Sequence, residues 1–304
     1  EKILLGERED VILCLCQHFH SMKELAKACE YLIKAAEVGI QSPLIYYNYF
    51  IIASTMGDLE VAIQGYKIAV ETSPELSLTP GQYIIEGVYE KNRYYTGFLG
   101  YDNIHNRQAV VKTLHDPPFE VLNNIKKACD LNSDSVIQIY EVNEAKEKRP
   151  CIVMEYFDNS TIEDYIIDQG ILNGEEFLLA FKQIVSIVAE AHDKGVVHGN
   201  LIPCKILILE DGIKILDFGL NPLADWKIPI TNEEMSDLCY KAPELFMRNS
   251  KPTMAGDVYS LGMIAYYIIT GTLPHPFLGN KLPANILPDN KKAIEIDPNK
   301  RFRT

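Results

Sequence analysis

Residues 198–205 and 217–219 bring together side chains that could take part in metal or proton-transfer chemistry. They read HGNLIPCK and DFG, so the carboxylate of Asp217 follows the amide of Asn200 and the amine of Lys205. A carboxamide does not take up a proton near neutral pH, so Asn200 cannot act as a general base. Two unit positive charges about 4 Å apart repel by roughly 4 kcal/mol at an effective dielectric near 20. A lysine ammonium that lies beside a carboxylate would therefore either exclude a metal ion from that carboxylate or replace it.

The two segments resemble the catalytic loop and the Asp-Phe-Gly motif of protein kinases. In that family an Asp accepts the substrate proton, while an Asn five residues later and the Asp of Asp-Phe-Gly hold magnesium. The matching positions here are Asn200, Lys205 and Asp217, and Ile202 stands where active kinases usually have a Lys that steadies the transferred phosphoryl group. The resemblance implies a kinase fold whose general base is missing, a loss on the order of a hundred- to ten-thousand-fold in rate.

Other stretches resemble kinase motifs in the family's order and at nearly its spacing. Residues 109–112 (AVVK) match the strand that bears the phosphate-contacting lysine, and residues 153–156 (VMEY) match the hinge between the lobes. The resemblance implies that a bound nucleotide, if there is one, would contact Lys112, Met154, Glu155, Tyr156 and Asp217.

The resemblance also implies structural roles in the larger lobe. Residues 242–244 (APE) and 297–301 (DPNKR) match two family motifs whose Glu and Arg form an ion pair, here Glu244 and Arg301. Asp257 opens the stretch that matches the buried central helix. His198 is expected to stack on Phe218 in the spine that joins the lobes.

The sequence departs from the kinase pattern at the glycine-rich loop. Only a backbone without Cβ atoms can approach nucleotide phosphates closely and point its amides at them. Residues 90–95 (EKNRYY) take that position without a glycine, and this bulky, partly acidic segment should clash with phosphates. Which side chain fills the adenine or phosphate space, whether Tyr94, Tyr95 or another, is left open by the sequence. The helix that normally offers a Glu to the strand lysine aligns with Asn124 there, and Glu120 lies one turn earlier. Lys112 then either pairs with Asp217 or contacts a nucleotide, and the sequence leaves both alternatives open.

Residues 9–76 contain an internal period. Ala28 and Ala62, and likewise Ala35 and Ala69, lie 34 residues apart, the length of a tetratricopeptide repeat. Small residues at this spacing let antiparallel helices approach closely. Two copies are fewer than the three that usually make a stable stack. We therefore expect the helices either to pack against the small lobe or to continue a longer array.

These patterns predict an α+β fold in which a helical segment precedes two lobes. The expected domains are residues 1–78, tetratricopeptide-like, and residues 81–304, kinase-like, with a β-rich small lobe over 81–156 and an α-rich large lobe over 157–304. An amphipathic helix is expected from residue 174, and its apolar positions are predicted to lie in the core: Leu178, Phe181, Ile184, Val185 and Val188.

The composition argues against some classes of partner and indicates a cellular compartment. The net charge of −13 argues against nucleic acid or an anionic membrane as the main partner. The apolar run over 263–269 is far shorter than the roughly 20 residues that span a bilayer. Seven cysteines without a Cys-x-x-Cys pair suit a reducing compartment, so a cytoplasmic location is expected. The cluster at residues 14–20 offers two Cys/His pairs on different helix faces, so no metal site is expected.

The sequence therefore predicts a pseudokinase that acts as a protein-interaction scaffold or allosteric regulator and is not an ordinary kinase. Protein partners are expected at the helical repeats, the large lobe or both. No cofactor is expected, although ATP could bind without the usual magnesium coordination. Two alternatives stay open: an atypical transferase that uses Lys112, Lys205 and Asp217, and a metal-independent nucleotide-binding switch.

Overall fold

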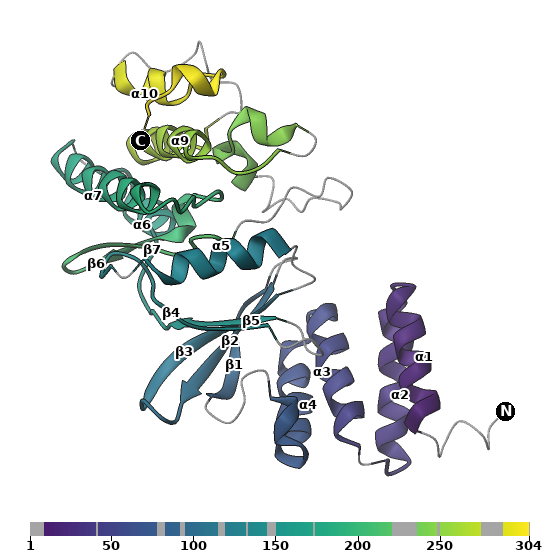
Figure 1. Cartoon of the computed structure of the whole chain (residues 1–304). Coiled ribbons are helices and arrows are strands. Elements are labelled where there is room, and N and C mark those ends of the chain that lie inside the picture. The colour runs from purple at the N-terminus through teal and green to yellow at the C-terminus, as the bar shows by residue number, and fades with distance from the viewer. Residues whose placement is uncertain are drawn as a thin grey trace. The chain divides into compact units, whose positions relative to one another are not determined.

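The computed structural model describes most of the chain, in two compact units. The described residues are 9–40, 42–77, 83–91, 95–114, 119–131, 133–144, 150–172, 174–220, 236–247, 250–274 and 288–303. One unit comprises residues 1–116 and 140–156, and the other comprises residues 117–139 and 157–304. The predicted α+β class is confirmed, because N-terminal helices are followed by a β-rich and then an α-rich part (Figure 1).

The first unit opens with two pairs of helices. Their bounds are α1 (Glu9–Ser21), α2 (Leu25–Glu37), α3 (Pro43–Met56) and α4 (Leu59–Thr72). Pro43 starts α3, where its missing N–H costs no hydrogen bond. Gly57 ends the same helix in the left-handed region with φ 93°, a conformation that glycine adopts without steric cost.

The 34-residue register is visible in the packing of these helices. Ala28 of α2 and Ala62 of α4 are both fully buried. The turn residues Lys23 and Gly57, separated by the same interval, both have positive φ. Each pair of helices thus has a buried alanine and a turn residue with positive φ at equivalent positions.

A five-stranded sheet completes the first unit. Its strands are β1 (Tyr83–Lys91), β2 (Tyr95–Asp102), β3 (Arg107–Leu114), β4 (Ile139–Asn143) and β5 (Cys151–Glu155). Their order is β1-β2-β3-β5-β4, so β3 lies at the centre. Phe98 pairs with Val111 and Gly97 with Lys112. Because side chains alternate along a strand, Val111 and Lys112 face opposite sides of the sheet.

Helices α3 and α4 cover one side of this sheet. Phe50 of α3 lies 5.5 Å from Phe98 of β2 and 5.1 Å from Tyr66 of α4, measured between ring centroids. Val111 and Val153 of the sheet join the same buried cluster. The helical segment and the sheet therefore share one core, which is the first of the two expected packing alternatives. The predicted boundary at residues 78–81 lies inside this unit.

We expect Phe50→Ala to destabilise the first unit by about 3–5 kcal/mol, because it removes a buried ring and leaves a cavity. Urea denaturation followed by circular dichroism would measure the change. Ile68→Ala, at an exposed position of α4, serves as a control that should cost less than about 1 kcal/mol. Equal effects of the two substitutions would contradict the shared core.

The second unit is mainly helical. It contains α5 (Phe119–Cys129), α6 (Ile162–Gln169), α7 (Gly174–Asp193), α9 (Met254–Thr270), α10 (Pro288–Ala293) and the hairpin of β6 (Ile206–Leu209) and β7 (Gly212–Ile215). Apolar residues bury α9 on nearly every side, and both α7 and α10 pack against it (Figure 1). Thr253 caps the first turn of α9 by accepting a hydrogen bond from the backbone N–H of Gly256.

The predicted core face of α7 was partly wrong. Ile184 and Val188 are buried, but Leu178 is 58% exposed and Val185 is 38% exposed. Phe177 takes the buried position in the first turn. Successive residues lie about 100° apart around a helix. The buried face of α7 is narrower than the face that carries the apolar residues, so Leu178 and Val185 at its edge are in contact with solvent.

Candidate functional site

Lys205 and Asp217 form an ion pair in the second unit. The Lys205 Nζ lies 2.8 Å from the Asp217 Oδ2, and the two side chains are 14% and 4% exposed. The β6–β7 hairpin separates the two residues in sequence and brings them together in space. A hydrogen bond from the Leu216 N–H to the Lys205 carbonyl closes the base of this hairpin. The Lys205 ammonium therefore contacts one of the carboxylate oxygens that a metal ion would need as a ligand.

The backbone around Asp217 is in an uncommon conformation. Asp217 has φ 63°, a region that Asp enters more readily than most residues, and Gly219 has φ 77°. A Cβ atom at Gly219 would lie 2.7 Å from the carbonyl oxygen of Asn124 in α5. The Asp-Phe-Gly segment thus rests directly on the α5 backbone, a contact that only glycine allows.

His198 is buried and held as a neutral ring. Its Nε2 lies 2.9 Å from the Leu216 carbonyl, so it must donate, and its Nδ1 accepts the N–H of Asn200. Its ring packs on Phe218 with 4.8 Å between centroids, as the resemblance implies. Burial lowers the pKa of His198 below its ordinary value of 6.5. The residue links the catalytic-loop segment to the Asp-Phe-Gly segment.

This arrangement predicts a loss of stability in acid. As the pH decreases through about 6.5, the unfolded chain takes up a proton at His198 more readily than the folded chain does. The free energy of unfolding therefore decreases as the pH decreases. The slope from one such proton is at most about 1.4 kcal/mol per pH unit. Urea midpoints between pH 7.5 and 5.5 would show a weaker dependence in His198→Gln. An unchanged dependence in that variant would contradict the assignment.

Asp257 of α9 fixes the catalytic-loop backbone. Its two carboxylate oxygens accept the N–H groups of His198 and Gly199, each at 2.8 Å, and Oδ2 also lies 2.9 Å from the His192 Nε2. Asp257 is almost fully buried. A buried carboxylate that accepts several hydrogen bonds holds the backbone of the loop in place.

The two other substituted positions of the loop differ in their surroundings. Ile202 is buried within the apolar core of the second unit. Asn200 is partly exposed. An apolar side chain at the first position and an amide at the second offer no proton acceptor for a hydroxyl substrate.

Glu244 and Arg301 form the ion pair that the resemblance implies. The Arg301 NH1 and NH2 groups donate to the two Glu244 oxygens at 2.6 and 2.8 Å. Arg301 also donates to the carbonyls of Ala255, Glu295 and Ile296. It thereby ties the chain end to the start of α9.

The other predicted nucleotide positions lie in the first unit. Lys112 and Met154 are buried on the sheet side opposite α3 and α4, whereas Glu155 and Tyr156 are half-buried. The Lys112 Nζ lies 3.2 Å from the Tyr95 hydroxyl and 4.4 Å from the centroid of its ring. The sequence pointed to Tyr94 and Tyr95 as bulky residues but did not identify this contact.

Parts of two expectations lie outside the described residues. These are residues 92–94 of the segment that replaces the glycine-rich loop, and the side chain of Glu120. Asn124 lies within α5, as the alignment predicts.

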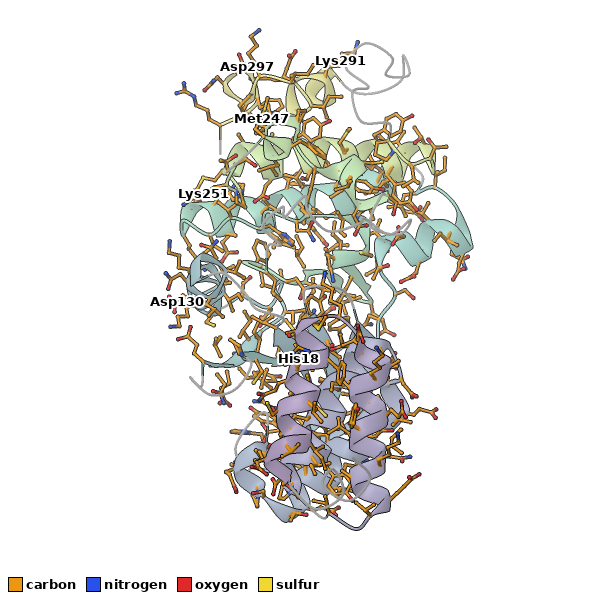
Figure 2. All side chains as sticks on the ribbon, turned by 90° about the vertical axis from the view of Figure 1, so that its right-hand side faces the viewer. His18, Asp130, Met247, Lys251, Lys291 and Asp297 are labelled. Carbon is orange, nitrogen blue, oxygen red and sulfur yellow. The ribbon has the colours of Figure 1, made fainter. Side chains whose placement is uncertain are left out.

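The donor set around Asp217 does not fit a magnesium ion. Mg²⁺ requires several oxygen ligands in near-octahedral geometry, whereas Lys205 contacts this carboxylate. Within the described part of the chain, no group of three or more His, Cys, Asp or Glu side chains is placed to hold a metal ion. This includes the last turn of α1, where His18 lies (Figure 2). Across the same residues, no helix is both long and apolar enough to cross a membrane.

Comparison with known proteins agrees with the motif order. Serine/threonine-protein kinase PrkC of Bacillus subtilis is 32% identical over 189 residues, which covers 58% of this chain and 28% of that kinase. Serine/threonine-protein kinase PknB of Mycobacterium leprae is 28% identical over 225 residues, covering 67% of this chain and 36% of that kinase. Probable serine/threonine-protein kinase PknB of Lactococcus lactis is 31% identical over 147 residues, covering 48% and 23%.

The chain thus spans between 23% and 36% of the length of these relatives. Residues 101–301 match the family described as the protein kinase domain, and this stretch is well over half of the chain. The fold, the order of the motifs and this match together show that the chain belongs to the protein kinase domain family.

Proposed function

We propose that this chain is a pseudokinase that serves as a protein-interaction scaffold or allosteric regulator. The observation that carries the proposal is the Lys205–Asp217 ion pair, 2.8 Å long and mostly shielded from solvent. In active kinases the corresponding two side chains both hold magnesium. Here one is a cation that neutralises the other, and Asn200 replaces the general base.

The relatives are named serine/threonine kinases, whereas we propose that this chain does not act as an ordinary kinase. The reason is that its differences from the kinase motifs fall on the reacting positions, while the supporting contacts are retained. Asp257, Glu244 and Arg301 form the hydrogen bonds that hold the large lobe together. A retained framework with altered reacting groups is the pattern expected of a binding module.

We further propose that the N-terminal helices are tetratricopeptide-like and contribute to binding a protein partner. The equivalent buried positions Ala28 and Ala62 and the equivalent turns at Lys23 and Gly57 support this reading. All seven cysteines are free thiols, which supports a cytoplasmic location.

A second function, a metal-independent nucleotide-binding switch, is favoured by the same ion pair. The ammonium of Lys205 places one positive charge where a metal would stand, so it could contact a phosphate without magnesium. An atypical transferase is the third reading, and the test below separates it from the other two.

The test is phosphate transfer from γ-labelled ATP to the chain itself and to a generic acceptor protein, with magnesium or manganese, alongside thermal denaturation with ATP. A scaffold shows no transfer and no change in melting temperature. A switch shows stabilisation that persists in EDTA, and saturating ligand at about a hundred times its Kd contributes about 2.7 kcal/mol. Metal-dependent transfer that disappears in Asp217→Asn would overturn the proposal.

A further inference from the structure

Tyr95 covers the amine of Lys112 within the first unit. Lys112 is 1% exposed and Tyr95 is 5% exposed, although the lysine carries a charge and the tyrosine a hydroxyl. The Nζ donates a hydrogen bond of 3.2 Å to the Tyr95 hydroxyl and lies 4.4 Å from the ring centroid. The ring therefore contacts the amine that, by the kinase resemblance, would meet a nucleotide phosphate.

The register of β2 and β3 explains how the ring reaches the amine. Lys112 pairs with Gly97, which has no side chain, and Tyr95 pairs with Leu114 two residues further along β3. Paired residues face the same side of a sheet, and diagonal neighbours lie within reach of an aromatic side chain. The absent side chain at Gly97 leaves the position opposite Lys112 open, and the ring of Tyr95 extends into it.

The contact is of a kind that stabilises an ammonium group. An aromatic face attracts an ammonium through its quadrupole, and the phenol oxygen accepts one of the three ammonium protons. A phosphate oxygen would need the same donor and the same space.

We propose that Tyr95 determines which ligands reach Lys112, by filling the position of a phosphate group. The ring weakens the binding of nucleotide phosphates or inorganic polyphosphate at this amine, and its removal strengthens that binding. This inference deepens the proposed loss of kinase function, but it concerns binding alone and is independent of the Lys205–Asp217 pair.

The test compares binding of inorganic tripolyphosphate and of ATP, both in EDTA, by isothermal titration calorimetry. Tyr95→Ala is expected to tighten binding about tenfold or more relative to the wild type. Tyr95→Val provides a second variant that removes the ring and has a higher strand propensity. Tyr95→Phe keeps the ring and is expected to bind as weakly as the wild type.

Two controls assign any gain to the amine. Tyr101→Ala removes a partly exposed tyrosine further along β2 and should leave binding unchanged. Adding Lys112→Met to Tyr95→Ala should abolish the gain. Equal binding by the wild type and by both ring-removing variants would overturn the inference, as would a gain that survives Lys112→Met. The pseudokinase proposal would be contradicted by a different result, phosphate transfer by the wild type, which is measured in a separate experiment.

Discussion

Lys205→Asn should lower the free energy of unfolding by about 3 kcal/mol in EDTA, because it removes one partner of a largely buried ion pair. Magnesium should restore part of this stability, since an amide oxygen beside Asp217 recreates two potential oxygen ligands. The wild type should be indifferent to magnesium. Chemical denaturation of both proteins in EDTA and in millimolar magnesium measures all of these quantities.

The second unit contains a matched control for this experiment. Lys194 forms a 2.9 Å ion pair with Glu190, but the two side chains are 41% and 48% exposed. Lys194→Asn should cost less than about 1 kcal/mol, as exposed pairs usually do. If the two lysine variants lose similar stability, or if magnesium stabilises the wild type as much as Lys205→Asn, then Lys205 does not take the place of a metal.

Arg301→Met should destabilise the second unit by about 3–5 kcal/mol, because it leaves Glu244 and several carbonyl groups without their donor. The guanidinium forms five hydrogen bonds, with Glu244 and with the carbonyls of Ala255, Glu295 and Ile296. Arg301→Lys should also be strongly destabilising, because a single ammonium cannot reproduce a planar set of donors. Urea midpoints followed by tryptophan fluorescence or circular dichroism provide the measurement.

Arg303 supplies the comparison, since it lies two residues away and is exposed. Arg303→Met is expected to change stability by no more than about 0.5 kcal/mol. A wild-type-like midpoint for Arg301→Lys would show that charge alone, without the fork of donors, is sufficient at that site.

The sequence predicted those parts of the fold and site that depend on residue type and order. The resemblance of residues 198–205 and 217–219 to kinase motifs was enough to expect that Lys205 would compete with a metal at Asp217, and the two side chains do lie in contact. The 34-residue interval placed Ala28 and Ala62 at equivalent positions, and both are buried, whereas the positive φ of Lys23 could not be expected from a residue type that rarely adopts it.

Other features depend on three-dimensional register, which the sequence does not reveal. The contact of Tyr95 with Lys112 requires Gly97 to pair with Lys112, and nothing local to either strand fixes that pairing. The signal that could have suggested it is a glycine two residues after a tyrosine in a strand next to the lysine strand. The exposed Leu178 shows the same limit, because an apolar pattern does not reveal how much of a helix its neighbours cover.

The contact between Phe50 and Phe98 has a practical consequence for dissecting the chain. A fragment that starts at β1 would present a sheet face of Phe98, Val111 and Val153 to water, and such a face favours aggregation. Recombinant fragments intended to isolate the catalytic-type region should therefore retain α3 and α4. Truncation experiments that remove these helices would report on a damaged sheet as well as on the loss of the helices that we propose to bind a partner.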